Sequence, residues 1–223
     1  MTHLTKISGW GNYPQQEAQL LTPSSSTSLE AIVRQKNNLI ARGMGRSYGD
    51  SANASKVLQT LYIGHFIEFN EFTGKLTAES GISLREILRV IVPKGWFLPV
   101  TPGTSYVTLG GAIASDVHGK NHHISGTFGQ HIVSLRMVLG TGEIVTTSLQ
   151  ENTDLFHATC GGMGLLGVIL SATIQLIPIR SSFINQRTIK TDCIEAACES
   201  FEDNSNATYS VAWIDCLAKG KSL

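Results

Sequence analysis

The stretch DVHGKNHH at residues 116–123 gathers three of the chain's seven histidines and a lysine around one glycine. Imidazole groups exchange protons near neutral pH, and an ammonium group binds hydroxyl or phosphate oxygens. Because glycine disfavours a helix interior, the stretch is predicted to be a loop that presents these groups. Histidine clusters can also bind zinc, but no carboxylate or cysteine lies at a fitting spacing, so no metal site is predicted.

The stretch RGMGRSYGD at residues 42–50 carries three glycines and two arginines directly after a predicted buried strand. Glycines allow successive backbone N–H groups to turn toward one concavity that binds phosphate oxygens, and arginine would add positive charge. A surface turn with solvated arginines is the alternative, but such a turn seldom needs three glycines in so short a space. The stretch is therefore predicted to bind the phosphates of a nucleotide.

A third glycine stretch, GGMGLLG at residues 161–167, has the G-x-G-x-x-G spacing of a dinucleotide fingerprint. That fingerprint needs a strand before it and a helix after it, whereas here a helical pattern precedes and the β-rich VILSATIQL follows. We interpret it as a tight connection between a helix and a strand. The chain contains no P-loop motif.

Composition narrows the class of protein. The 223 residues carry no formal net charge and are 42% hydrophobic, which indicates a globular protein. No basic stripe is present, so nucleic acid is not a predicted partner. The N-terminus lacks a secretion signal, and no run approaches the roughly 18 apolar residues of a membrane span, so a cytoplasmic protein without an integral membrane segment is predicted. The four cysteines form no C-x-x-C pair and predict neither a zinc site nor disulfides.

In the first hundred residues, helical and strand patterns alternate. A capping box at Thr27 and Glu30 predicts a helix over about 28–37, and NLIA predicts a strand. FIEFNEFTGKLTAESG predicts a hairpin with its turn at Thr73 and Gly74, and SLREILRVIVP predicts a helix that ends at Pro93.

The rest of the chain follows with less regularity. LGGAIAS predicts a short, closely packed helix, and a second hairpin turns at Thr141 and Gly142. A helix opened by Asn152 or Thr153 precedes the long strand LLGVILSATIQLIPI. After Ile179 we expect a strand, a helix and a further strand that bury little together.

This order predicts an α+β fold. We expect a first lobe over residues 1–100, a second lobe over residues 101–180, and the incomplete beginning of a further, substrate-binding domain over residues 181–223. Glycines cluster at 43–49, 103–119, 126–129 and 161–167, which predicts that several backbone segments approach one bound molecule.

Three stretches carry a resemblance to a known family. RGMGRSYGD, TPGTSYVTLGGAIASDVHGKNHHISGTFGQHIVSLRMVLGTGEIV and LFHATCGGMGLLGVI resemble the FAD-binding domain of the vanillyl-alcohol oxidase (PCMH-type) flavoproteins. Within that superfamily the chain is most similar to the decaprenylphosphoryl-β-D-ribose oxidase group, from GWGNYP to YSVAWID. The resemblance implies two α/β lobes with FAD extended between them.

The resemblance also implies a set of cofactor-binding residues. The first glycine loop would hold the diphosphate, and residues 102–104 would line the flavin. Residues 108–111 would approach the diphosphate and the ribityl chain, and residues 115–118 would run along the isoalloxazine ring. A strand residue would touch the adenine end through its backbone. The full implied set is Arg42, Gly43, Met44, Gly45, Arg46, Ser47, Tyr48, Gly49, Pro102, Gly103, Thr104, Thr108, Leu109, Gly110, Gly111, Ser115, Asp116, Val117, His118 and Ile169. Many relatives bind FAD covalently through a histidine where this chain has Arg46, so noncovalent flavin is implied.

Three residues are implied in the chemistry. His118 would lie beside the isoalloxazine ring, Lys120 would point into the substrate pocket, and Tyr48 would lie near the same pocket. Trp213 matches a pocket-lining aromatic residue, with a core position as the alternative. His122 and His123 are expected to hold the loop.

The implied activity is oxidation of a secondary sugar alcohol, such as C2 of a polyprenyl-phosphate ribose, by hydride transfer to flavin N5. A partner reductase that completes an epimerisation is implied by the resemblance alone. Two alternatives remain: an alditol or aldonolactone oxidase that uses oxygen, and a flavin-binding module without activity, because further site residues of this group lie beyond these 223.

Overall fold

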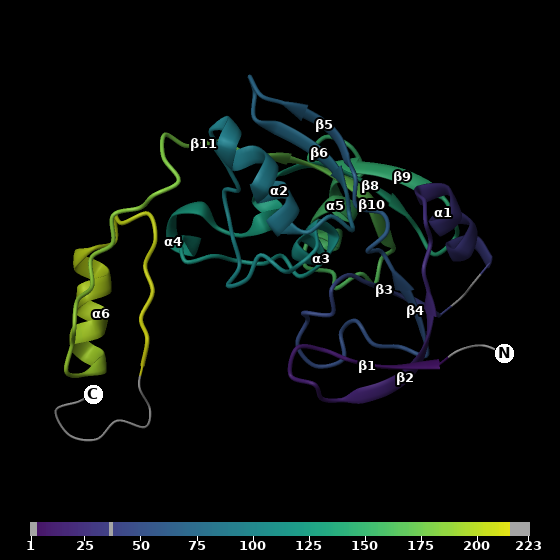
Figure 1. The fold of residues 1–223 in the computed structure, drawn as a ribbon, viewed down its shortest axis with the longest axis horizontal. Coiled ribbons are helices and arrows are strands. Elements are labelled where there is room, and N and C mark those ends of the chain that lie inside the picture. Colours follow the sequence, from purple (N-terminus) through teal and green to yellow (C-terminus); the bar gives the residue numbers. More distant parts are fainter. Residues whose placement is uncertain (1–3, 36–37, 215–223) are drawn as a thin grey trace.

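The computed structural model describes residues 4–35 and 38–214, which form two β-sheets with helices packed on them (Figure 1). In the first sheet, β2, β4 and β3 run parallel, and β1 pairs antiparallel with β2. The second sheet is antiparallel throughout. In spatial order, the first sheet contains β1 (Leu4–Ser8), β2 (Gln15–Leu21), β4 (Lys56–Gln59) and β3 (Ile40–Arg42). The second contains β5 (Phe66–Asn70), β6 (Lys75–Glu79), β10 (Val168–Gln175), β8 (Ile132–Val138) and β9 (Ile144–Ser148). The predicted α+β class is confirmed.

The two sheets divide the chain earlier than the sequence suggests. β6 pairs with β10 along five residues, and the hydroxyl groups of Thr77 and Thr173 lie 2.9 Å apart across this pair. The chain therefore passes from the first sheet to the second between β4 and β5. The domain boundaries predicted at residues 100 and 180 remain predictions. Below, "first lobe" means residues 4–64 and "second lobe" means residues 65–179.

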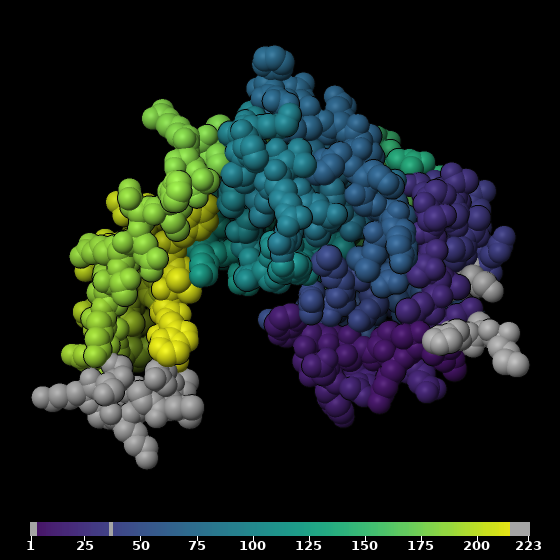
Figure 2. Space-filling model, in the orientation of Figure 1, coloured from purple at the N-terminus to yellow at the C-terminus, as the bar shows by residue number. Residues whose placement is uncertain are grey.

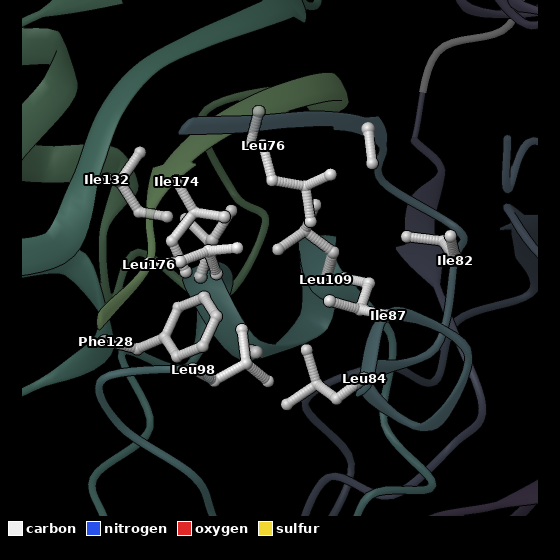
Figure 3. Packing of buried hydrophobic residues seen from close by; sticks show 14 of the residues in the cluster. Leu76, Ile82, Leu84, Ile87, Leu98, Leu109, Phe128, Ile132, Ile174 and Leu176 are labelled. Carbon is white, nitrogen blue, oxygen red and sulfur yellow. The ribbon is translucent and has the colours of Figure 1, made fainter. Parts of the chain in front are cut away.

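The core of the second lobe lies between its sheet and three helices (Figure 3). These are α2 (Leu84–Ile91), α3 (Leu109–Ala114) and α5 (Thr153–Thr159). Leu109 from α3 and Phe128 from the short helix η2 (Phe128–His131) are fully buried against Ile174 of β10. Burying such a side chain contributes about 1.5–3 kcal/mol. This packing fixes α3, which supplies one wall of the candidate site.

Helix α1 (Ser26–Gln35) joins the two lobes. Its buried residues Leu29 and Val33 pack with Leu58 of the first lobe and with Val138 and Leu170 of the second. The helix begins two residues earlier than predicted, and Ser25 and Ser28 at its start exchange side-chain hydrogen bonds with each other's backbone N–H groups. This pair takes the place of the predicted box of Thr27 and Glu30, which is wrong.

The predicted hairpins and the second helix are confirmed. Gly74 and Gly142 occupy the two turns with positive φ values of 69° and 83°. At α2, the Ser83 side chain accepts from the Glu86 backbone N–H, and the Glu86 carboxylate accepts from the Ser83 backbone N–H and hydroxyl. The Ser83 side chain and backbone hydrogen bonds hold the pKa of Glu86 below its ordinary value. The α-helix ends at Ile91, and Pro93 lies in the short helix η1 (Val92–Lys94).

Beyond residue 179 the chain differs from the expectation. The predicted helix is present as α6 (Ile194–Asp203), but residues 180–192 and 208–214 form no strand. In Figure 1, α6 projects away from the two sheets, while residues 207–210 after it contact the histidine loop (residues 116–123) of the second lobe. Within the described residues, neither segment pairs with the edge of a sheet, and a strand needs such a partner. A two-stranded ladder of β7 (Trp96–Phe97) and β11 (Ile177–Pro178) precedes this segment.

Candidate functional site

The glycine loop at residues 43–49 meets the first turn of α3 across the boundary between the lobes. A Cβ atom added at Gly43 would lie 2.2 Å from the Thr108 hydroxyl oxygen, which no real side chain tolerates. Thr108 is buried and caps α3 by accepting from the Gly111 N–H at 3.1 Å. The contact brings together two of the backbone segments that the sequence predicts to converge on one ligand.

The loop's backbone donors are unused within the described residues. None of the N–H groups of residues 43–49 donates a hydrogen bond to another described part of the chain. The loop is only partly exposed, and Gly45 and Gly49 have φ values of 66° and 57°. A run of unpaired donors on a glycine-rich bend is a structure that binds anions. The loop therefore fits a diphosphate group.

The loop after α5 has the opposite character. The N–H groups of Gly161 and Met163 donate to the carbonyls of Ile113 and Ala114 at the end of α3, at 3.0 and 2.8 Å. The Gly162 N–H donates back to Thr159. Because these donors are already paired, the stretch 161–167 serves to connect α5 with β10, as predicted from its context.

Arg42 has a structural role in the arrangement. Its guanidinium group donates to the carbonyls of Ser8 and Ala52 and to the Asn53 side chain, at 2.6, 3.1 and 2.9 Å. Burial lowers the pKa of this group from its ordinary value. The expectation that the arginine would lend its charge to a phosphate does not fit these contacts for Arg42, because all three hydrogen bonds hold the walls of the loop.

The other loop residues differ in exposure. The Tyr48 ring is 81% exposed and touches no described side chain through a hydrogen bond or ring contact. The guanidinium carbon of Arg46 lies 5.1 Å from the Trp10 ring centroid, a cation–π arrangement. The Ser47 hydroxyl is buried and has no hydrogen-bond partner among the described residues. A buried, unpaired hydroxyl beside free amides again indicates room for a polar ligand.

The segment from Pro102 to Gly111 enters the site from the second lobe. Pro102, Gly103 and Thr104 form an irregular stretch, in which a side chain at Gly103 would meet open space. Leu109 is buried in the core, and a Cβ atom at Gly110 would lie 2.8 Å from that of Ser80. The N–H groups of both residues are already paired, with the carbonyls of Ile82 and Ser80 at 2.8 Å, so neither residue offers a free backbone donor to a ligand.

The stretch 115–118 turns sharply at the end of α3. Ser115 is exposed, and Asp116 has a φ of 40° while its carboxylate accepts from the Gly129 N–H at 2.7 Å. Val117 packs against the core, and His118 is exposed in a single bridge with Thr127. Ser115 and His118 are thus the two exposed residues of this stretch, and His118 is the one of the two with an ionisable side chain.

The histidine loop is tied down by its neighbours. His122 lies 3.2 Å from the Gly126 carbonyl through Nδ1, and its ring meets that of His118 edge-on at 5.6 Å. His123 Nε2 lies 3.0 Å from the carbonyl of Ala207. These contacts fit the expected loop-holding role of His122 and His123. Among the described residues, no group of three or more histidine, cysteine, aspartate or glutamate side chains could hold a metal ion.

Lys120 and Trp213 are both exposed. The Lys120 carbonyl accepts from the Ser210 N–H at 2.9 Å, so the segment after α6 lies against the histidine loop. The Lys120 ammonium has no partner among the described residues, and Trp213 is 86% exposed. The structure does not bring Lys120, Trp213 and Tyr48 into contact with one another. Trp213 is not a core residue in the described part of the chain.

Ile169 and Cys160 lie deeper. Ile169 is 6% exposed in β10 with its side chain in the core, so only its backbone is left for the predicted adenine contact.

Burial, reinforced by the nearby Asp116, raises the pKa of Cys160 to about 11. The Cys160 thiol is therefore protonated near neutral pH and unsuited to covalent attachment of a cofactor.

A hollow of about 280 Å³ opens beside the glycine loop. It is lined by Lys6, Ile7, Ser8, Leu20, Arg42, Gly43, Met44, Gln59 and Leu61. A broader depression of about 390 Å³ lies away from the site, on the outer side of α2. Figure 2 shows the surface hollowed between the first lobe, the second lobe and the α6 segment.

Sequence reasoning missed two contributors to the site. Asn121 is 2% exposed and donates to the Pro99 carbonyl at 2.8 Å, which ties the histidine loop to the segment that leads into Pro102. Gly9 and Trp10, in the turn after β1, contact the backbone of the glycine loop. The paired glycines of GWG were the available signal for the second contributor.

Comparison with known proteins gives one family and several relatives. A sequence model described as "FAD binding domain" matches residues 18–148. The chain is 35% identical to decaprenylphosphoryl-beta-D-ribose oxidase of Mycolicibacterium smegmatis, over all of this chain and 50% of that protein. It is 28% identical to D-arabinono-1,4-lactone oxidase of Yarrowia lipolytica over 80% of this chain and 36% of that protein. Delta(24)-sterol reductase of Rattus norvegicus is 32% identical over 56% of the chain. The chain spans half or less of the length of these relatives.

Proposed function

The chain belongs to the family of FAD-binding domains, with FAD as its cofactor, and on this basis we propose that it is the flavin-binding part of an enzyme that oxidises a secondary sugar alcohol. The membership makes it an FAD-binding oxidoreductase. The relative that matches the whole chain is named for a polyprenyl-phosphate sugar, decaprenylphosphoryl-ribose. We propose a sugar or polyprenyl-phosphate sugar as the substrate.

One observation carries this proposal: a cluster of unpaired polar groups borders the predicted flavin edge. His118 and the Lys120 ammonium are exposed on one loop and lack charged partners in the described part of the chain. The loop is held against Thr101, where a Cβ atom at Gly119 would lie 2.8 Å from the carbonyl oxygen. The proposed flavin-lining residues Pro102 and Gly103 follow directly.

The proposed oxidation removes a proton and a hydride from one secondary alcohol group. The hydroxyl group gives up a proton while the hydrogen on its carbon leaves as hydride, and the product is a ketone. Bound FAD would supply the hydride acceptor, N5 of its ring. In our proposal, Lys120 binds a substrate hydroxyl or phosphate oxygen, His118 borders the ring, and Tyr48 and Trp213 border the pocket from the first lobe and from the segment after α6.

The experiment that tests this proposal is anaerobic reduction of the flavin in the full-length protein. Polyprenyl-phosphate ribose, free pentoses, alditols and aldonolactones are offered separately, and bleaching of the flavin's visible absorption is followed. We expect bleaching with a sugar that carries a free secondary hydroxyl. Failure of every carbinol in the panel to bleach the flavin would contradict the proposal.

A second candidate is an alditol or aldonolactone oxidase that passes electrons to oxygen. The match to the lactone oxidase of Yarrowia lipolytica over 80% of the chain favours it. Oxygen consumption during turnover with an alditol or lactone would identify this activity. The chain by itself would in either case act as a flavin-binding module, because it spans half of the mycobacterial relative. In the first candidate, a partner reductase would return the ketone to an alcohol of opposite configuration.

Noncovalent binding of the flavin is a separate prediction. Arg46 stands where many members of the superfamily place the histidine that is linked to the flavin, and its guanidinium group lies over Trp10. An arginine forms no such linkage, so acid precipitation is expected to release the yellow colour into the supernatant. Absorption spectra of the two fractions make the measurement, and colour that stays in the washed pellet would disprove noncovalent binding.

A further inference from the structure

The turn between β1 and β2 touches the glycine loop from the side of the first lobe. We call residues 8–12 the hairpin tip. The match to the family model begins at residue 18 and leaves this segment out. Ser8 also lines the 280 Å³ hollow together with Gly43 and Met44, so hairpin and loop share one surface.

Four contacts join the hairpin tip to the loop. The Trp10 N–H donates to the Ser47 carbonyl at 2.8 Å, and the Arg42 guanidinium donates to the Ser8 carbonyl at 2.6 Å. The Arg46 guanidinium carbon lies 5.1 Å from the Trp10 ring centroid. At Gly9 the backbones touch, because an added Cβ atom would lie 2.6 Å from the Ser47 carbonyl oxygen.

These contacts decide where the loop's N–H groups point. In a trans peptide group the carbonyl of one residue and the N–H of the next point in opposite directions. The Ser47 carbonyl faces the hairpin tip, so the Tyr48 N–H points away from it. The Arg42 carbonyl accepts from the Thr60 N–H at 3.0 Å, so the Gly43 N–H points away from Thr60, an orientation that does not depend on the hairpin tip. Both N–H groups are unpaired within the described residues.

We propose that the hairpin tip is a positioning element of the cofactor site: through the Ser47 carbonyl it holds the Ser47–Tyr48 peptide group so that the Tyr48 N–H faces the FAD diphosphate. The inference rests on the proposed placement of that diphosphate at the glycine loop. Trp10 and Gly9 act through the loop, since their contacts reach the loop's carbonyls. Preorganised donors bind an anion without first losing conformational freedom.

Two glycines in the same turn provide a matched test. Gly9→Ala places its methyl group against the Ser47 carbonyl and that of Gly49, at 2.6 and 2.5 Å, and must push the hairpin tip away from the loop. Gly11→Ala meets nothing within 4 Å. The flavin is removed, FAD is titrated back, and the dissociation constant is taken from the change in flavin fluorescence. We expect Gly9→Ala to weaken FAD binding by about tenfold or more, as for loss of one hydrogen bond to a charged group, and Gly11→Ala to leave it unchanged.

Trp10 provides a second test that does not threaten the fold, since its side chain is 53% exposed. Trp10→Ala removes the cation–π contact with Arg46 and is expected to weaken FAD binding about two- to fivefold. Trp10→Phe keeps an aromatic face and should restore most of the affinity. If Gly9→Ala fails to fold, the two Trp10 variants test the inference instead. Equal FAD affinity in Trp10→Ala and the parent protein overturns the inference.

The loop itself separates the two proposals. A Gly45→Val protein that still takes up FAD would refute the placement of the diphosphate at residues 43–49, and with it this inference. A Gly45→Val protein that loses FAD, beside a folded Gly9→Ala protein that binds FAD normally, would refute the role of the hairpin tip alone.

Discussion

Replacing Gly45 by valine is expected to abolish FAD uptake. Gly45 has a φ of 66°, a conformation that a β-branched residue adopts only under strain. Its added Cβ atom would lie 2.2 Å from the Arg42 guanidinium nitrogen. That guanidinium cannot swing aside cheaply, because three hydrogen bonds hold it to Ser8, Ala52 and Asn53.

The loop must therefore move, and its free N–H groups move with it. Loss of two hydrogen bonds to the diphosphate, at about 1.5–3 kcal/mol each, weakens FAD binding by at least roughly 10²-fold. Flavin content of the purified protein and titration of the flavin-free protein with FAD make the measurement. Gly45→Ala, which lacks the β-branch, should show a smaller loss.

A matched valine elsewhere controls for a general effect on folding. Gly140, in the turn between β8 and β9, has open space around an added Cβ atom. Gly140→Val should bind FAD like the unchanged protein. Normal FAD uptake by a Gly45→Val protein would mean that the glycine loop serves another purpose.

Replacing Lys120 by alanine in the full-length protein is expected to impair turnover and leave the flavin bound. The Lys120 ammonium has no partner in the described part of the chain, so its loss leaves no buried group unpaired. Its carbonyl continues to accept from Ser210, because that bond belongs to the backbone. A lost hydrogen bond between a charged group and substrate lowers kcat/KM by about 10- to 100-fold.

The measurement combines kcat/KM, on the substrate found by flavin reduction, with the flavin content of each variant. Lys120→Arg keeps the charge but changes its shape, and should recover part of the activity. Lys75→Ala, on the exposed side of β6, removes a lysine outside the site and should change neither quantity. Unchanged turnover in Lys120→Ala would remove Lys120 from the proposed site.

The local elements followed closely from the sequence because their causes are local. The turns at Gly74 and Gly142 need positive φ, and the Ser83 cap with Glu86 lies within four residues. The family could also be identified from the sequence, because the glycine-rich and histidine-rich stretches are typical of it. The sequence also predicted correctly that a helix precedes and a strand follows the stretch 161–167.

Tertiary contacts decided what the local pattern left open. β5 and β6 have no residue pattern that says which sheet they join, and only the pairing with β10 places them in the second lobe. The charge of Arg42 suggested a phosphate contact, but its three hydrogen bonds lie on segments 34, 10 and 11 residues away. The expected strands after residue 179 are absent from the described residues 180–214, because a strand needs a partner edge.

By itself, the sequence determined that this protein belongs to a family of FAD-binding domains, and it located the glycine-rich bends that we propose as the binding site, because glycine frees the backbone at those positions. Which N–H groups are free, and which way they face, was decided by contacts between distant segments: Gly43 against Thr108, and Trp10 against Ser47. A peptide group takes its orientation from whatever accepts or donates on its other side, and that partner is known only once the chain has folded.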